Sequence, residues 1–352
     1  MKGREELQGE LVETISWGTL VPADHPLRKI RQLVDRVLGE LGPEIEKLYA
    51  VEGRPSVPPE WLLRAMLLQV LYGIRSDRKL LEQLRYSLLF RWFVGMRMAD
   101  RVWDEATMSR ARVRFAEGGL IRKWLERTVE EARRRGWVSK EYFSVDGTLV
   151  RAWASMESVR PKGEEGRKKD FRGERRTNRT HRSVTDPEAR LYRKGSGKEA
   201  ILCYMSHVLA EGRSGLVVDY RTTQAEGTAE PKAALEMIQR CLKGKRRAKV
   251  AADKGYDQRG FVEAVRALGV VPHVARKRRG SAVDGRTVRH RSYEESQRVR
   301  RWAEGIFGWA KGWSNLGRIM VRGLQKIDFF SGLIYLAYNL LRMARLSVQV
   351  GG

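Results

Sequence analysis

Near residue 140 the hydrophobic pattern of this chain changes its period, and no other feature limits the possible folds as strongly. Up to about residue 138, apolar residues recur at the three- and four-residue spacing of amphipathic helices. Beyond that point come short apolar runs bounded by glycine and polar residues, which are typical of strands. For a chain of 352 residues this predicts two domains, an all-helical one over 1–138 and a second over 139–348.

The helical domain allows two interpretations. The segment "RPSVPPEWLLRAMLLQVLYGI" has Pro59 where a first helical turn tolerates it, and it is apolar nearly all round, which predicts a helix buried in a bundle. Several shorter helical segments with arginines on their outer faces follow it. They suit a DNA-binding module of the helix-turn-helix kind. A helical domain for packing or dimerisation fits them equally well.

The second domain combines strands with helices. Three strand-like runs, "YFSVDGTLVRAWA", "AILCYMSHVLA" and "GLVVDYRTT", precede an alternation of helix, strand, helix, strand and a long helix from about Glu294 to Trp313. This order predicts an α/β layer with mixed strands. Residues 156–198, basic and poor in apolar side chains over most of their length, interrupt the pattern after the first run. We expect an exposed insertion there that need not be ordered.

The charge of the chain indicates a polyanionic partner. Its 69 Lys and Arg against 43 Asp and Glu give a formal net charge of +26 and a pI near 10.4, which is extreme for an enzyme of small metabolites. Nucleic acid is the first candidate, and a basic ribosomal or membrane-surface protein is the alternative. The insertion and a basic loop over 276–291 flank the strands that carry the candidate site, so we expect both to contact phosphates.

Other features exclude some classes of protein. Two cysteines, Cys203 and Cys241, cannot form a disulfide framework and lack metal-binding spacing, so a reduced cytoplasmic compartment fits. The apolar stretches are too short to span a bilayer, and the first residues do not resemble a signal peptide. The histidines show no paired ligand spacing, and we expect His207 and His273 to be structural.

Asp146 is the first candidate for chemistry, because it lies inside the strand-like run "FSVDGTLV". A half-buried strand tolerates a carboxylate only when something compensates its charge. The alternative is a hairpin, since Asp-Gly between apolar residues is a strong turn signal.

A second carboxylate, Asp253, directly follows the strand-like run "AKVAAD". Ligands of open α/β sheets bind at the carboxyl ends of strands. If the two strands are neighbours, their spacing of about 4.8 Å brings Asp146 and Asp253 within reach of one metal ion. Carboxylate oxygens favour Mg²⁺ or Mn²⁺ over zinc.

The third carboxylate, Glu304, lies on the helical segment "SQRVRRWAEGIFGWAKGW". At about 100° per residue, Arg300, Glu304 and Lys311 share one narrow face of this helix. The alternative is an ordinary exposed ion pair between Arg300 and Glu304.

Together these segments resemble the DDE transposases of bacterial insertion sequences, in particular the group numbered five. The similarity covers roughly residues 20–345 and includes the segment from "RPSVPPEWLL" to "LFRWFVGM", as well as "VDGTLVRAWAS", "TDPEARLYRKG", "ADKGYD" and "RRWAEGIFGWAK". The resemblance implies an RNase H-like mixed sheet flanked by helices, preceded by an all-helical N-terminal domain for DNA binding or dimerisation.

The resemblance also implies the roles of individual residues. It makes Asp146, Asp253 and Glu304 the catalytic, metal-binding triad, with Arg300 and Lys311 matching the basic residues that flank the glutamate. One departure is Gln297, which stands where the related signature has tyrosine and puts any role of that tyrosine in end binding in doubt. Besides Arg300 and Lys311, we expect DNA contacts from Lys254, Arg278 and Arg279.

The function implied is a DNA transposase that binds terminal inverted repeats, cleaves phosphodiester bonds and joins the ends to target DNA. Three carboxylates would hold two Mg²⁺ or Mn²⁺ ions for this chemistry, and pairing two ends implies a homodimer at least. Two alternatives remain. One is an RNase H-like nuclease without strand transfer, and the other is a transposase-derived DNA-binding protein without catalysis.

Overall fold

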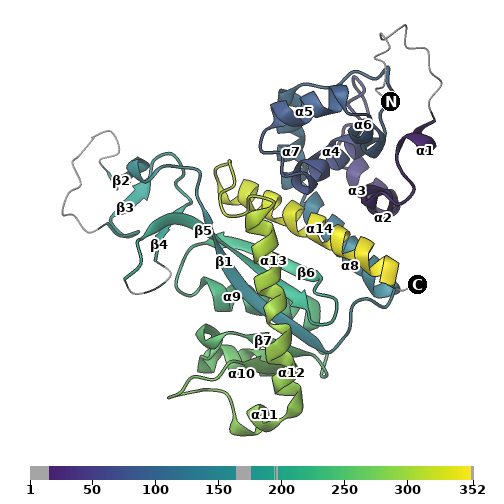
Figure 1. Cartoon of the computed structure of the whole chain (residues 1–352). Helices are drawn as coiled ribbons and strands as arrows, with labels where there is room; N and C mark the ends of the chain where they lie inside the picture. The colour runs from purple at the N-terminus through teal and green to yellow at the C-terminus, as the bar shows by residue number, and fades with distance from the viewer. Residues whose placement is uncertain (1–15, 164–175, 194, 196, 350–352) are drawn as a thin grey trace, which may run out of the picture.

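The computed structural model describes residues 16–163, 176–193, 195 and 197–349 (Figure 1). The helices of its N-terminal part are α1 (Trp17–Leu20), α2 (Pro26–Glu40), α3 (Gly42–Glu46), α4 (Pro59–Leu71), α5 (Asp77–Tyr86), α6 (Leu88–Val94), α7 (Glu105–Glu117) and α8 (Leu120–Arg134). Side chains fix where several of them begin. Ser76, Ser87 and Asp104 accept hydrogen bonds from backbone amides in the first turns of α5, α6 and α7.

Helix α4 is the centre of the helical part. Pro59 is its first residue, and most of its side chains from Leu62 to Leu71 are buried. The sequence prediction of a helix buried on nearly all sides is therefore confirmed. Because every face of α4 is covered, the shorter helices around it are fixed in position by apolar packing.

A mixed sheet forms the second part of the molecule. Its strands are β1 (Tyr142–Arg151), β4 (Arg190–Tyr192), β5 (Ile201–Glu211), β6 (Val217–Gln224), β7 (Lys249–Ala252) and β8 (Val271–Val274). Strand β5 is antiparallel to β1 and β6, whereas β7 is parallel to both β1 and β8. The order β6-β5-β1-β7-β8 is an antiparallel meander extended by two parallel strands, which is the RNase H-like arrangement. The predicted fold class is confirmed.

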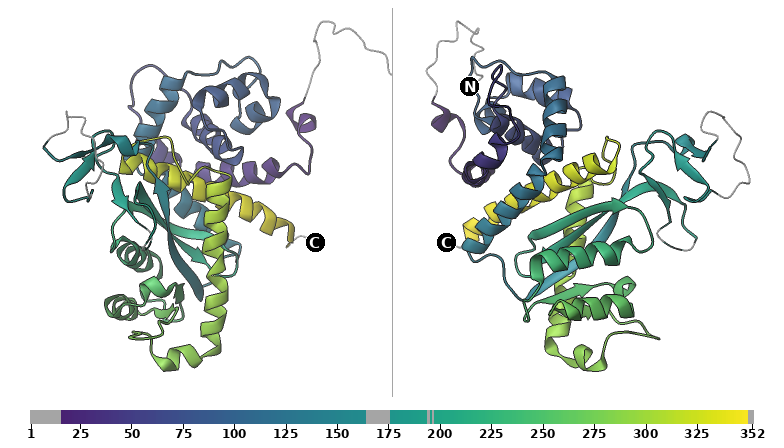
Figure 2. Two further views of the ribbon diagram at one scale, coloured as in Figure 1. Left: turned by 60° about the vertical axis from the view of Figure 1, so that its left-hand side comes forward. Right: turned by 180° about the vertical axis from the view of Figure 1, so that it is seen from behind.

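Helices cover both faces of this sheet. They are α9 (Ala229–Leu242), α10 (Arg259–Ala267), α11 (Gly285–Arg289), α12 (Arg291–Val299), α13 (Arg301–Gly312) and α14 (Leu324–Gln349). Helices α9 and α13 lie on opposite faces, since α13 is in front of the sheet in Figure 1 and α9 is in front of it in the reverse view of Figure 2. The predicted long helix over 294–313 is divided at Arg300 into α12 and α13.

Part of the insertion after β1 is ordered. The 3₁₀ turn η1 (Met156–Ser158) leads into β2 (Val159–Pro161), which pairs with β3 (His181–Ser183), and β4 then joins the edge of the main sheet beside β5. In Figure 2 the β2–β3 pair projects beyond the sheet. The expectation of disorder also covers 164–175, 194 and 196, which lie outside the described residues.

The last helix, α14, joins the two parts of the molecule. It contacts α8, α2 and α4 as well as β6. The Asn339 side chain accepts a hydrogen bond from the Val217 amide at 2.9 Å and donates one to the Val217 carbonyl at 2.7 Å. Among the helices of the described residues, none combines the length and apolar character needed to cross a bilayer.

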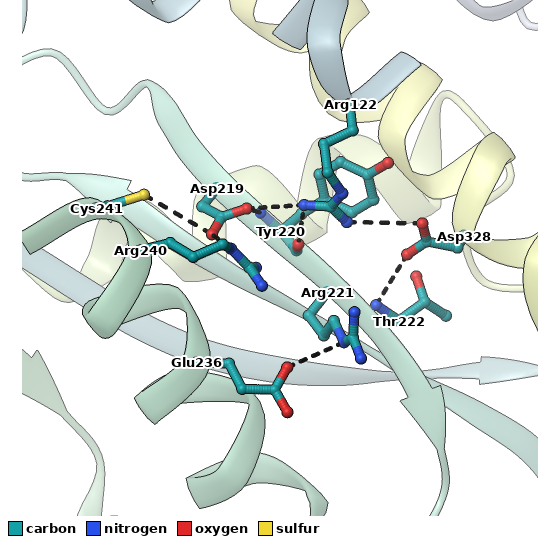
Figure 3. Close-up of polar contacts among 9 residues, drawn as sticks. All are labelled: Arg122, Asp219, Tyr220, Arg221, Thr222, Glu236, Arg240, Cys241 and Asp328. Carbon is teal, nitrogen blue, oxygen red and sulfur yellow. Dashed lines mark hydrogen bonds and ion pairs between the residues drawn. The ribbon is translucent and has the colours of Figure 1, made fainter. Parts of the chain in front are cut away.

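An ionic network around the buried Asp219 lies where α8, α14 and β6 meet (Figure 3). Arg122 of α8 reaches Asp219 of β6 at 3.0 Å and Asp328 of α14 at 3.6 Å. Arg240 of α9 approaches the other oxygen of Asp219 at 2.8 Å. Three helices are thereby tied to one strand, and this fixes the helical part against the sheet.

Candidate active site

Asp146 lies within an uninterrupted strand. Strand β1 pairs with β5 from Phe143 to Arg151, so the Asp-Gly pair forms no turn, and the hairpin alternative is wrong. Asp146 is half-buried, and its Oδ1 accepts a hydrogen bond from the Gly147 amide at 2.8 Å. The carboxylate is therefore held close to the strand from which it projects.

A glycine is required at position 147 because two side chains lie close to its backbone. A β-carbon at this position would be 2.8 Å from Nδ1 of His207 and 3.1 Å from Oε1 of Glu230. Both distances are too short for ordinary contact. The glycine next to Asp146 thus allows a histidine of β5 and a glutamate of α9 to approach the backbone of β1.

Asp253 ends up beside Asp146 because of the parallel pairing. Ser144 is opposite Ala251 in the register of β1 and β7, so two residues further on Asp146 of β1 is level with Asp253, the residue after β7. The side chain of Asp253 caps the 3₁₀ turn η2 (Lys254–Tyr256), accepting a hydrogen bond from the Gly255 amide at 2.7 Å.

The pKa of the Tyr256 hydroxyl responds to the acidic groups near it. It is almost fully buried, and burial is the largest cause that raises the pKa of its hydroxyl. The negative charges of Glu230, Asp146 and Asp253 raise this pKa further. Carboxylates from β1, α9 and the end of β7 therefore act electrostatically on one buried hydroxyl.

Glu304 lies in the first turn of α13, and its side chain is exposed. Helix α13 packs against β1 and β5, which puts Glu304 on an element adjacent to Asp146. Within the described ranges, no three acidic, histidine or cysteine side chains come close enough together to hold one metal ion. The structure thus brings the two aspartates to one edge and leaves Glu304 on the neighbouring helix.

The expected DNA-binding residues lie at the surface of the described chain. Lys254, Arg278, Arg279 and Lys311 are exposed, and Arg300 at the junction of α12 and α13 is partly so. Arg300 Nη1 is 3.5 Å from Oε1 of Gln297. Gln297, the departure from the related signature, donates a hydrogen bond to the His273 carbonyl of β8 at 2.6 Å and so ties α12 to the sheet.

Sequence reasoning missed Asp257, which organises the loop that carries Arg278 and Arg279. Its two carboxylate oxygens accept hydrogen bonds from the Lys277 and Ala282 amides, both at 2.8 Å. Burial opposes the charged form of Asp257, but these hydrogen bonds lower its pKa. The sequence could have indicated Asp257, because it is the last residue of the segment "ADKGYD" that contains Asp253.

A second basic surface lies at the other end of β1. Arg151 forms an isolated bridge with Arg318, and the Arg318 guanidinium lies 4.8 Å from the ring centre of the exposed Trp153. Cationic and aromatic groups in this arrangement suit a nucleic-acid strand. No sequence pattern indicated it, because Arg318 is far from Trp153 along the chain.

Two family models match the chain. One, described as a transposase DDE domain, matches residues 143–340, and the other, described as a transposase domain (DUF772), matches residues 15–114. Together they cover both parts of the molecule. No curated protein matches the chain in sequence.

Some solved structures are distantly similar. The piggyBac transposase synaptic complex with hairpin DNA aligns over 93% of this chain and 74% of its own, at 8% identity and a TM-score of 0.42. A pre-cleavage Mos1 transpososome aligns over 83% of this chain and 98% of its own, at 12% identity and a TM-score of 0.21. The Mos1 paired-end complex with the left transposon end aligns over 83% and 80%, at 14% identity and a TM-score of 0.21.

Proposed function

Because the chain belongs to the DDE transposase family, whose catalytic-domain model matches more than half of it, we propose that Asp146, Asp253 and Glu304 are its catalytic triad. One observation carries this proposal, namely the parallel register of β1 and β7, which sets Asp146 of β1 level with Asp253, the residue that follows β7. Glu304 is the third member, since it lies on the helix packed against β1. The chain is a DNA transposase, and the triad is where we place its chemistry.

Membership of this family implies the use of a divalent metal. The residue types fit such an ion, because the register of β1 and β7 brings Asp146 and Asp253 level and their carboxylates offer the oxygen ligands that Mg²⁺ and Mn²⁺ prefer. We propose that Asp146, Asp253 and Glu304 would together hold two such ions. When bound, a metal pair supplies activation of the attacking oxygen and stabilisation of the leaving one. Glu304 must turn toward the aspartates to complete the set.

The cations around the edge hold the DNA backbone in this proposal. Arg300, between α12 and α13, and Lys311 of α13 flank Glu304 in the sequence, while Lys254 and the loop with Arg278 and Arg279 follow Asp253. Exposed lysines and arginines at these places neutralise phosphates and keep the scissile bond near the carboxylates. Arginine adds two-point contacts to phosphate oxygens.

The wider reaction follows from the same arrangement. We propose that the helical part over 1–138 recognises terminal inverted repeats or mediates dimerisation, and that the part over 139–348 cuts there and joins the ends to target DNA. Since two ends must be paired, the active form is a homodimer. We place the reaction in the cytoplasm, where Cys203 and Cys241 stay reduced.

The experiment is a cleavage and strand-transfer assay on DNA that carries the repeats bracketing the encoding locus. Asp146→Asn, Asp253→Asn and Glu304→Gln should each abolish Mg²⁺-dependent nicking and joining, because each removes one ligand charge. Binding to the repeat ends should remain close to that of the wild type. Glu294→Gln is the matched control, since Glu294 is an exposed acid on the adjoining helix α12.

Each other outcome contradicts a defined part of the proposal. Normal cutting and joining by Glu304→Gln would remove Glu304 from the triad. Cleavage without joining of pre-cut ends would mean a nuclease without strand transfer. Specific binding with no Mg²⁺-dependent nicking by the wild type would mean a DNA-binding protein without catalysis.

A further inference from the structure

We propose that α7 is the helix of the helical part that contacts DNA, and that a cavity beside it binds one backbone phosphate of the terminal repeat. This inference rests on the proposed function, which left open whether the helical part binds DNA or mediates dimerisation. The sequence did not indicate which helix would make such a contact.

The first observation is the cavity itself, which has a volume of about 440 Å³ and lies between α7 and the segment over 49–57. This size is typical of clefts that bind ligands. One acid, Asp104, is part of the wall, but its carboxylate accepts a hydrogen bond from the Thr107 amide at 2.7 Å and caps α7. Against this single acid the wall has three basic side chains, those of Arg54, Arg110 and Arg114.

The second observation is that these three arginines form no ion pair within the part of the chain that the structure describes. Arg110 donates a hydrogen bond to the Thr107 hydroxyl at 3.2 Å, and the Arg114 guanidinium lies 4.5 Å from the ring centre of Tyr49. A guanidinium that no carboxylate occupies can give two parallel N–H donors to a phosphate. The cavity is therefore suited to an anion.

The third observation is the contrast with Arg112 on the same helix. Arg112 forms an ion pair with Asp77 of α5 and donates a hydrogen bond to the Gln69 side chain of α4 at 2.9 Å. Its guanidinium also lies 5.3 Å from the ring centre of Phe330 of α14. Arg112 thus fixes α7 to three other helices, which gives it a structural role.

The other two arginines of α7 lie on the opposite face. At about 100° per residue, Arg110 and Arg114 are about 40° apart around the helix and about 160° away from Arg112. Because contacts on the far side hold α7 in place, its position does not have to be ordered when a ligand enters the cavity. Binding then avoids part of the entropy loss that a mobile segment would suffer.

The charge of the whole chain favours DNA over a second copy of the protein as the occupant. Each copy carries a formal net charge of +26, so a positive cavity has little attraction for another copy. DNA supplies a regular row of phosphates, and a protein that neutralises one of them releases counterions. The occupant we assign is therefore a phosphodiester of the DNA backbone.

The test is fluorescence anisotropy of the full chain on DNA that carries the repeats bracketing the encoding locus, over a salt series. Combining Arg110→Gln with Arg114→Gln should weaken binding and lower the log–log salt slope by roughly 0.9, the value for one lost phosphate contact. The matched control combines Arg97→Gln with Arg127→Gln. It removes the same charge from exposed arginines of the helical part that are paired with acids, and should leave the slope unchanged.

A second variant separates loss of charge from loss of folding. Combining Arg110→Lys with Arg114→Lys keeps both charges and should keep the wild-type slope, while the affinity falls because lysine lacks the two-point contact. Thermal melting shows whether all variants are folded. A slope reduced equally by lysine and by glutamine would contradict charge neutralisation at this cavity.

Neutral methylphosphonates at single positions of the repeat DNA identify the phosphate. At the position that the cavity binds, the substitution should weaken binding by the wild type but not by the Arg110→Gln and Arg114→Gln variant. If every position that matters to the wild type matters equally to the variant, the inference is overturned.

The outcomes separate this inference from the proposed function. An unchanged slope in the glutamine variant, with nicking still lost in Asp146→Asn, overturns the inference and leaves the triad standing. A reduced slope with normal nicking by Asp146→Asn overturns the triad and supports the inference. An unchanged slope with weaker self-association in analytical ultracentrifugation would make the cavity part of a dimer interface, which also overturns the inference.

Discussion

Carboxylates in two regions of the same sheet have different hydrogen-bond partners. Where β6 meets α8 and α14, Asp219 accepts hydrogen bonds from Arg122 and from Arg240 (Figure 3). Asp146 of β1 and Asp253, the residue after β7, accept hydrogen bonds from the backbone amides of Gly147 and Gly255. Arginine side chains thus bind the first carboxylate, whereas backbone amides bind the other two.

The difference in partners indicates a structural role for the first region and a functional role for the second. A buried carboxylate held by two arginines contributes to the folded state, and removing one partner leaves an uncompensated charge. Acidic groups that act on one buried hydroxyl, as Asp146 and Asp253 act on that of Tyr256, are typical of functional sites. Ionic networks and catalytic edges can thus be told apart by which groups face each acid.

The largest effect on the free energy of unfolding is expected when two aspartates, Asp219 and Asp146, are each replaced by alanine and compared. Asp219→Ala should lower the free energy of unfolding by about 2–3 kcal/mol, below the usual 3–5 for a fully buried pair because its arginines are partly exposed. Asp146→Ala should change it by less than about 1 kcal/mol. Urea unfolding of both variants measures this, and equal losses would break the comparison.

A smaller effect is expected at Gly147. Gly147→Ala puts a methyl group against the buried His207 ring and the Glu230 carboxylate, so it should destabilise the fold by about 1–3 kcal/mol. Thermal melting measures the loss. Gly227→Ala is the control, because nothing lies within 4 Å of its added β-carbon. Equal melting temperatures in both variants would contradict the tight packing at β1.

Asp257 offers a pH-dependent test of a carboxylate held by amides. Its pKa lies below the ordinary 3.8, so its contribution is complete above that value and is lost as pH falls through the lower folded-state pKa. Asp257→Asn should cost about 1 kcal/mol at neutral pH, and the difference from the wild type should shrink as the pH falls below 3.8. A difference that grows on acidification would reverse the assigned sign.

The smallest effect concerns DNA affinity rather than folding. Replacing both Arg278 and Arg279 by alanine should reduce the salt dependence of DNA binding by about two phosphate contacts, a change of roughly 1.8 in the log–log slope. Fluorescence anisotropy over a salt series measures it. Arg259→Ala is the control, because Arg259 is already paired with Glu263. An unchanged slope in the double variant would remove this loop from the DNA interface.

Much of the architecture could be predicted from local pattern. The buried helix α4 and the order of strands and helices from β5 to β8 follow from the spacing of hydrophobic residues, since that spacing within one element shows which of its faces are buried. The continuity of β1 through Asp146 and Gly147 could not be predicted. A turn and a strand share the Asp-Gly signal, and only the pairing with β5 and the side chains over Gly147 decide between them.

By itself the sequence determined the element types, the basic charge and the family to which the chain belongs, because these depend on spacing and composition along the chain. Only the tertiary structure decided which distant side chains meet. The parallel register of β1 and β7 sets Asp146 beside Asp253, and the docking of α9 brings Glu230 to the same edge. Contacts of this kind form through packing between elements, which no local pattern encodes.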